Sequence, residues 1–485
     1  MVKIPMMYRR SLVCVSLIAA ITACSNPTAI SEQTKQLALP TNWQSGVSIV
    51  DTTYKTLGDW RLIVEDEQLQ QIINKALVGN QKLNAQYQEL LIAKQQLVVS
   101  NATDFPELSL VSGQSRQKSV GDSTSYQNYA NIDLQLSYEV DLWGKLSNQQ
   151  QKAKLDYQAA KLAFMQAKNE LITNVVSAWF NLAEAKQLNQ LYVERAHNLK
   201  NNLSIINASY QLGLSEALDV YLTQNDVSRE LARIEQQQQV VKERERAMDI
   251  LIGQYPIAVD YLNMAIELPK LSDDIFVELP SNAMTASYQV QEKWIELLAA
   301  DANLAVAHKQ RFPSLTLTAS GGDTSDELLS LLDGGSLAWS IAGNLVAPVF
   351  NGGRLAAQEE QARLTVKKVE QDYISNLYSE FAEIENQISQ HYSLTQQLSH
   401  YQNAKGNALS AETLSFNQYQ KGLVSYSTVL ESQRRAFDSS TSVVQISNQL
   451  VQNRIALYAN LGGNALAQSF QQKVTPKSQS QVIYD

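Results

Sequence analysis

The feature that most constrains this 485-residue chain is that its sequence is an internal duplication. The segment FPELSL, which begins at Phe105, returns as FPSLTL at Phe312. The tripeptide that begins at Gly144 returns 209 residues later with Lys145 replaced by Arg354, and the pattern Tyr-Gln-x-Gly-Leu that begins at Tyr210 returns at the same offset. The order of these motifs, their chemical character and their spacing are the same in both halves. We therefore expect two copies of one structural repeat of roughly 200 residues, at 61–275 and 280–465.

A stretch of alternating polarity occurs in each repeat. From Ile132 to Val140 apolar and polar residues alternate without interruption, and the same pattern runs through Leu315, Leu317 and Ala319. Period two predicts β-strands with one apolar and one polar face. Strands of about ten residues with this pattern suit an outer-membrane barrel, but a half-buried sheet in a water-soluble protein has the same pattern. The strands alone leave the two environments open.

The alternating strands are expected to pair as one β-hairpin in each repeat. The hairpins are placed at about 106–142 and 313–349, with the polar stretches Lys118–Gln127 and 321–335 as their loops. Two hairpins supply four strands, which cannot close a barrel, and open strand edges cannot face lipid because their backbone groups would stay unpaired. Since bacterial membrane barrels begin at about eight strands, membrane strands would require the chain to form an oligomer.

A long helix is predicted after each hairpin. No Gly or Pro occurs from Lys145 to Leu212, and only Gly406 occurs from Arg354 to Lys421. Ala, Leu, Gln, Glu and Lys dominate both stretches and are good helix formers. At 1.5 Å per residue each helix would span roughly 100 Å, which indicates a rod or a coiled-coil wall. The frequent Gln and Asn side chains suit either a water-filled lumen or a solvated exterior.

A glycine is expected to end each long helix. Gly213 and Gly422 stand where a glycine beyond a helix end turns the chain. The remaining helices expected in the two repeats are a first helix that runs to about Asn101, its counterpart at 286–309, and the return helices at 215–251 and 425–461. The fold predicted from the residues is therefore mainly α-helical, with a duplicated unit of long helices and a hairpin.

The first residues of the chain have the pattern of a secretion signal. Lys3, Arg9 and Arg10 precede an uncharged apolar stretch, 11–23, that is too short to span a bilayer. The signal peptide is therefore assigned to 1–23. The sequence Ile-Thr-Ala-Cys ending at Cys24 resembles the bacterial lipobox, in which Cys24 would become the lipid-bearing first residue of the segment 24–60. An ordinary signal peptide with an incidental cysteine is the alternative.

Composition excludes several classes of protein. The formal net charge is −9 and no basic run occurs, which argues against nucleic-acid binding. Cys14 and Cys24 are the two cysteines, so neither a disulfide framework nor a cysteine-based zinc site is expected. The four histidines have no spacing that suggests a catalytic triad or a metal motif. We therefore expect no enzyme activity, no catalytic residues, no metal and no cofactor.

The motifs resemble those of the TolC family of outer membrane efflux proteins, in particular its lipidated branch. The segments that carry the resemblance follow the two hairpins and surround the two helix turns: Tyr138–Lys145, Ala347–Arg354, Tyr210–Val220 and Tyr419–Leu430. One departure is that Ala286–Val290 stands where this branch usually has Arg-Pro-Asp. The resemblance implies a homotrimer with a twelve-stranded β-barrel and a periplasmic α-helical barrel, since three copies supply twelve strands.

The resemblance also implies a function. The protein would be a passive exit duct for drugs or other small toxic compounds, driven by an inner-membrane pump through a periplasmic adaptor. It would lie in the cell outer membrane, lipid-anchored, in contact with outer membrane lipid and extending into the periplasm. A duct for type I protein secretion with the same fold is one alternative, and a lipid-anchored periplasmic coiled-coil scaffold without a pore is another. The C-terminal tail, 466–485, is polar.

The candidate site residues that the resemblance implies lie at the helix tips. Thr428 and Glu431 fall on the two positions of an acidic gate ring, and Asp219 lies at the corresponding turn of the first repeat. A ring of like charges is expected to select cations and to raise its own pKa values. Each carboxylate is equally well explained as an ordinary helix-start charge. The residues expected to contact the adaptor, whose alternative role is simple helix capping, are Gly213, Leu214, Gly422 and Leu423.

Overall fold

The structure is a computed structural model that describes residues 27–35, 40–45, 66–120, 124–261, 268–271, 275, 280–325 and 337–461. The predicted signal peptide, the lipidation site Cys24 and the C-terminal tail lie outside the described residues. None of the described helices has the length and apolarity needed to cross a bilayer.

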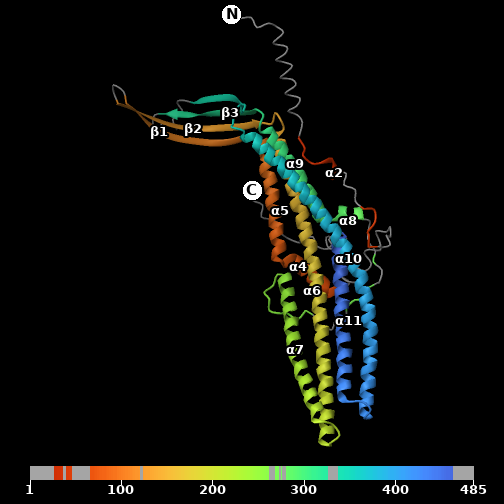
Figure 1. Cartoon of the computed structure of the whole chain (residues 1–485). Helices are drawn as coiled ribbons and strands as arrows, with labels where there is room; N and C mark the ends of the chain where they lie inside the picture. The colour runs from red at the N-terminus through yellow and green to blue at the C-terminus, as the bar shows by residue number, and fades with distance from the viewer. Residues whose placement is uncertain are drawn as a thin grey trace. The chain divides into compact units, whose positions relative to one another are not determined.

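The same order of elements occurs in both halves of the chain (Figure 1). In the first half α4 and α5 precede the strand pair β1 and β2, and the helices α6 and α7 follow; in the second half α8 and α9 precede β3 and β4, and α10 and α11 follow. The long helices α6 (Lys145–Gln211) and α10 (Arg354–Gln420) each have 67 residues, and the return helices α7 (Ala217–Leu251) and α11 (Tyr426–Asn460) each have 35. The predicted helix ends are correct to within one or two residues for both long helices.

The first helix of the first repeat is interrupted, unlike the single helix predicted there. α4 (Glu67–Gly79) is capped by Asp66, whose carboxylate accepts hydrogen bonds from the backbone N–H of Gln68 and Leu69. Asn80 then leaves the helical conformation, and its side-chain oxygen accepts a 2.9 Å hydrogen bond from the N–H of Leu83. Asn80 therefore caps a second helix, α5 (Gln81–Asn101). Ser287 similarly separates α8 (Pro280–Ala286) from α9 (Tyr288–Lys309).

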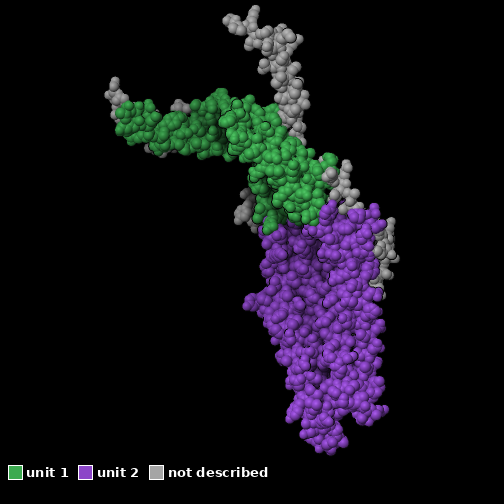
Figure 2. Space-filling model, in the orientation of Figure 1, with its two compact units in different colours: residues 1–37, 89–161, 292–375 green, residues 38–88, 162–291, 376–485 purple. Residues whose placement is uncertain are grey.

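Two compact units make up the chain, and each draws on both repeats (Figure 2). Unit 1 comprises 1–37, 89–161 and 292–375, and it contains all four strands. Unit 2 comprises 38–88, 162–291 and 376–485, and it contains α7, α11 and most of α6 and α10. The repeats of the sequence therefore interleave in space, because equivalent elements of the two copies pack with each other.

Unit 1 contains one antiparallel sheet in the order β1-β2-β3-β4. Its strands are β1 (Glu107–Val120), β2 (Thr124–Val140), β3 (Ser314–Ser325) and β4 (Ala338–Val346). The two hairpins are joined by the antiparallel pairing of β2 with β3, which runs from Ala130 opposite Ser325 to Val140 opposite Leu315. The predicted loop at Lys118–Gln127 is wrong, because Val120 pairs with Thr124 and both strands extend into it. Strand β3 likewise continues to Ser325, into the loop predicted at 321–335.

The register places apolar and polar residues on opposite faces of this sheet. Strand partners that share one face form the rows Leu108–Leu136–Ala319–Ile341, Leu110–Leu134–Gly321–Trp339 and Val140–Leu315–Leu345. The alternate rows are polar, as in Ser109–Gln135–Ser320–Ser340. The apolar face is exposed in the isolated chain, with Trp339 at 77% and Ile341 at 74% exposure. The alternation predicted for β2, β3 and β4 is therefore confirmed, and the first residues of β1 continue the same rows.

The described part of the N-terminal segment packs on helices in each unit. In unit 1 Ile30 is buried against apolar residues of α9 and α10, and the N–H of Ser31 donates a 2.8 Å hydrogen bond to Glu370. In unit 2 the ring of Trp43 lies 4.9 Å from that of Phe381. These contacts fix a segment that contains one short helix, α2 (Glu32–Lys35).

Helix packing in unit 2 combines an apolar core with buried amides. Trp179, Leu182 and Met248 are fully buried. The buried amide of Gln237 on α7 donates a hydrogen bond to the carbonyl of Ala185 on α6, and that of Asn453 on α11 donates to the carbonyl of Gln387 on α10. Buried amides satisfy polar groups that packing would otherwise leave unpaired. Part of the Gln and Asn content therefore bridges helices, a role that the sequence did not indicate.

Candidate functional site

Two helix turns at one end of unit 2 form the candidate site (Figure 1). After α6 the backbone N–H of Leu214 donates to the carbonyl of Ser209, and the N–H of Gly213 donates to that of Tyr210, at 2.8 and 2.9 Å. After α10 the corresponding bonds of Leu423 and Gly422 are 3.0 and 2.8 Å. This pair of bonds is a Schellman motif, which needs a residue with positive φ.

Both turns need glycine because of its backbone conformation, and not because a side chain would lack room. The φ angles of Gly213 and Gly422 are 70° and 69°. A Cβ atom added at either glycine would meet no heavy atom within 4 Å. A side chain is therefore disfavoured at these positions by the backbone alone, because L-residues adopt this conformation only at a cost.

A shared apolar cluster holds the two turns together. Ile206 of α6, Val220 of α7 and the α11 residues Tyr426 and Val429 are buried in one cluster. The rings of Tyr419 and Tyr426 lie 5.3 Å apart, and burial raises the pKa of Tyr426 to about 12. The structure thus places the two predicted tips side by side, as parts of one site.

Outside this cluster the two turns expose different side chains. The α6–α7 turn exposes four large apolar residues to between 60% and 78%, namely Leu212, Leu214, Leu218 and Tyr221. The α10–α11 turn exposes Leu423 to 69%, followed by the small polar residues Ser425, Ser427 and Thr428. The first tip therefore has an apolar surface, whereas the second is largely polar.

The predicted gate residues are placed around the shared cluster but in different surroundings. Thr428 is exposed on the first turn of α11, where its hydroxyl lies 3.2 Å from that of Ser425. Asp219 lies on the first turn of α7, and burial together with the nearby Glu216 carboxylate raises its pKa. Glu431 lies two residues after the buried Val429 and is 41% exposed at its side chain.

Glu431 is bound by two arginines that the sequence analysis did not identify. Arg434 donates to both carboxylate oxygens of Glu431 at 2.8 to 3.0 Å, and Nε of Arg435 donates to Oε1 at 2.8 Å. Hydrogen bonds from Arg435 and Arg434 lower the pKa of Glu431 within one chain. The rise expected for a ring of carboxylates concerns three copies, so it stays a prediction. The spacing i, i+3 and i, i+4 from Glu431 was the available sequence signal.

A buried ion pair further along the same helices was also missed. Nε of Arg195 on α6 lies 3.5 Å from Oε2 of Glu230 on α7, and the Glu230 side chain is 2% exposed. The guanidinium of Arg195 lies 4.3 Å from the ring centroid of Phe437 on α11. Burial raises the pKa of Glu230 despite the neighbouring arginine. This pair links both helical hairpins, and no periodicity in the sequence indicates it.

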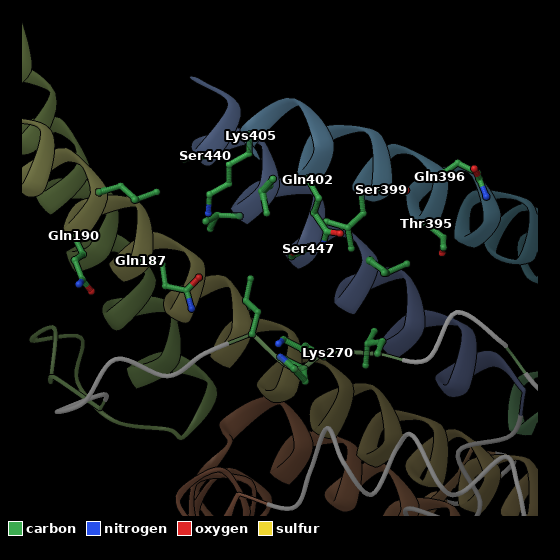
Figure 3. A pocket seen from close by; sticks show the side chains of 18 of the residues that line it. Gln187, Gln190, Lys270, Thr395, Gln396, Ser399, Gln402, Lys405, Ser440 and Ser447 are labelled. Carbon is green, nitrogen blue, oxygen red and sulfur yellow. The ribbon is translucent and has the colours of Figure 1, made fainter. Parts of the chain in front are cut away.

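A groove of mixed polarity lies between α6, α10 and α11 in unit 2 (Figure 3). Its volume is about 950 Å³, and the short segment Leu268–Leu271 forms part of its wall. Amides and hydroxyls line it together with as many apolar side chains, and its charged residues are Glu194, Lys270 and Lys405. Among the described residues no three His, Cys, Asp or Glu side chains are grouped so that they could hold a metal ion.

Comparison with known proteins gives matches along most of the chain. The family model described as outer membrane efflux protein matches residues 72–254 and 279–463. A probable outer membrane lipoprotein of Salmonella typhimurium, SilC, is 26% identical over 470 residues, which cover 94% of this chain and 99% of the relative. The toluene efflux pump outer membrane protein TtgC of Pseudomonas putida is 24% identical and covers 90% of this chain and 93% of its own length.

The cation efflux system protein CusC of Escherichia coli matches in both sequence and structure. Its sequence is 25% identical over 461 residues, which cover 93% of this chain and 98% of the relative. A crystal structure of CusC, from work on transmembrane channel formation, superimposes with a TM-score of 0.77 at 22% identity. It covers 87% of this chain and 96% of its own. The fold of one chain is therefore that of an outer-membrane channel subunit.

Proposed function

Because this chain belongs to the outer membrane efflux protein family, we propose that three copies assemble into a passive outer-membrane duct for drugs or other small toxic compounds. An inner-membrane pump supplies the energy, and a periplasmic adaptor couples that pump to the duct. The chain itself carries out no covalent chemistry in this proposal. The relatives are likewise described as efflux proteins and not as enzymes.

The observation that carries this proposal is the exposed apolar face of an unclosed sheet. The sheet ends at β1 and β4, whose outer edges have no partner strand among the described residues. Open edges cannot face lipid, because their backbone groups would lack hydrogen bonds. Joining β4 of one copy to β1 of the next removes every edge, and three copies give a closed barrel of twelve strands. The apolar face then contacts lipid and the polar face lines water.

A scaffold without a pore accounts less well for this sheet. Large apolar residues cover one face in register, and Leu110, Trp339 and Ile341 are each more than 60% exposed. Water-soluble proteins seldom expose a contiguous apolar surface of this kind. Lipid contact gives the surface a role, whereas a periplasmic coiled coil does not.

The helix tips are proposed to meet the adaptor. Leu212 and Leu214 flank Gly213 and are 75% and 78% exposed, and Gly422 and Leu423 form the second contact. Exposed leucines at the end of a helical hairpin suit burial against another protein. Glu431 and Thr428 of the α10–α11 tip are proposed to form the gate, together with Asp219 on the first turn of α7 across the shared cluster.

The lipid anchor at Cys24 is part of the same proposal. SilC is described as a probable outer membrane lipoprotein, and Ile30, near Cys24 in sequence, is already fixed on α9 and α10. A diacylated Cys24 would then insert into the same membrane that the strands of unit 1 are proposed to span. The relatives are described as acting on cations and on toluene, so the transported compound is left to the efflux assay below.

The test combines assembly and transport. The protein is extracted from outer membranes in detergent, its mass is measured by light scattering, and its conductance is recorded in planar bilayers. In parallel, a strain that lacks its own efflux duct is complemented and exposed to dyes, solvents and metal ions. A conducting trimer that restores resistance supports the proposal. A monomer without conductance that stays in solution once Cys24 is replaced would reject it in favour of the scaffold.

A further inference from the structure

One face of α11 near the tip carries both signs of charge in equal number. At 100° per residue, Thr428, Glu431, Arg434, Arg435 and Asp438 lie on one side of the helix. The opposite side holds the buried residues Tyr426, Val429, Ala436 and Ser440. Two carboxylates and two guanidiniums therefore share the surface that the shared cluster leaves exposed.

The charges on this face are paired and not merely close in sequence. Arg434 uses Nε and Nη2 to bind both oxygens of Glu431, and Arg435 binds Oε1 from the next helical turn. Nη1 of Arg434 also lies 3.8 Å from Oδ2 of Asp438. A carboxylate held by two planar guanidiniums is a strong, geometrically defined arrangement.

The pairing matters for the electric field more than for stability. Exposed ion pairs contribute roughly 0–1 kcal/mol to folding, so stability does not explain two arginines on one carboxylate. The charge of a carboxylate paired at 2.8 Å, however, is largely cancelled at a distance by its partner. Salt screens the remaining field over about 8 Å at physiological ionic strength. A ring built from three copies of this face has no formal net charge.

We propose that Arg434 and Arg435 set the charge selectivity of the duct by compensating Glu431, so that its mouth admits small organic anions and neutral compounds as well as cations. This inference rests on the proposed function, because only a pore built from α11 gives the face a permeating solute. An uncompensated ring of Glu431 carboxylates would instead select cations.

The experiment measures ion permeability in the assembled protein. Purified wild type, R434Q/R435Q and E431Q are each reconstituted in planar bilayers, and the ratio of K⁺ to Cl⁻ permeability is obtained from the reversal potential in a KCl gradient. The matched control, R229Q/R244Q, removes two exposed guanidiniums from α7 and leaves Glu431 paired. We expect weak selectivity for the wild type and the control.

The two mouth variants should shift selectivity in opposite directions. R434Q/R435Q should raise the K⁺ preference by about tenfold, and E431Q should favour Cl⁻ by a similar factor, because local potentials of a few kT change local ion concentrations by this order. If the double variant fails to assemble, the E431Q shift and the weak wild-type selectivity still test the inference.

Failure of the inference differs from failure of the proposed function. A conducting wild type with strong cation preference, or variants that conduct with unchanged permeability ratios, would overturn the role of the two arginines while leaving the duct in place. A wild type without any conductance would overturn the duct and this inference with it.

Discussion

The two helix turns of this protein have the same backbone and different surfaces. Both are Schellman motifs closed by a glycine near φ 70°, and both join a 67-residue helix to a 35-residue helix. The first turn exposes Leu212, Leu214 and Tyr221, whereas the second presents Thr428 and the charged face of α11. The backbone of each turn depends on one positive φ at its glycine, so the side chains around it can differ without changing the turn.

The difference indicates a division of roles between the tips. An apolar surface is suited to burial against a partner protein, and a hydrated charged surface is suited to a water-filled passage. The shared cluster around Ile206 and Tyr426 holds both surfaces in one place.

The largest effect is expected from opening the shared cluster. Ile206 is 1% exposed and contacts residues of the other turn. Ile206→Ala should lower the free energy of unfolding by about 2–5 kcal/mol, because it removes buried methyl groups and leaves a cavity. The measurement is thermal or denaturant unfolding followed by circular dichroism. The neighbouring Ile205 is 46% exposed, so Ile205→Ala is the matched control and should change stability much less.

The next largest effect should distinguish the apolar tip from the polar one. L212S/L214S should weaken binding of the periplasmic adaptor by tenfold or more, since burying a leucine side chain contributes about 1.5–3 kcal/mol. Leu423→Ser, which removes the one large exposed apolar side chain at the start of the second turn, should weaken it less. Binding of the purified adaptor by surface plasmon resonance provides the measurement. Equal losses at both tips would contradict the division of roles.

The shared backbone predicts equal responses at the two glycines. Gly213→Ala and Gly422→Ala should each cost about 1–2 kcal/mol, because both residues have positive φ and an added Cβ meets nothing that could compensate. Gly406, inside α10, also has open space around it but a helical backbone. Gly406→Ala should therefore stabilise by about 0.5–1 kcal/mol. Thermal unfolding of the three variants tests whether the backbone φ angle, and not steric crowding, determines whether alanine stabilises or destabilises the protein.

The smallest effect is a difference in pH dependence between the tips. Hydrogen bonds from Arg435 and Arg434 lower the pKa of Glu431, so its stabilising contribution is present above the unfolded pKa near 4.5 and is lost as the pH falls through the folded pKa. Burial and Glu216 raise the pKa of Asp219, so its ionisation is unfavourable above the folded pKa and this penalty disappears below the unfolded value near 3.8.

Thermal unfolding between pH 3 and 7 measures this difference. E431Q should be less stable than the wild type at pH 7, and D219N should be more stable. Both differences should vanish toward the acidic end of the range. If the stability difference between E431Q and the wild type instead grew on acidification, the pKa of Glu431 could not be lowered in the folded protein, and the prediction would be wrong.

Sequence periodicity and glycine placement were sufficient for most of the secondary structure. The long helices end within one or two residues of Leu212 and Lys421, as predicted, because a run without Gly or Pro has no local reason to stop before the turn. Strict alternation also assigned the faces of the strands. The first hairpin loop was placed wrongly because Gln114–Ser119 are polar on both faces, and only pairing with β2 makes them a strand.

By itself the sequence determined the duplication, the helix lengths, the glycine turns and the two-faced strands, since each is a local property of neighbouring residues. Tertiary structure decided which groups meet: the cluster that joins both turns, and the buried pair of Arg195 and Glu230 with the ring of Phe437 beside it. These contacts depend on how helices distant in sequence pack, and on which rotamers that packing leaves available. Local periodicity cannot specify either one.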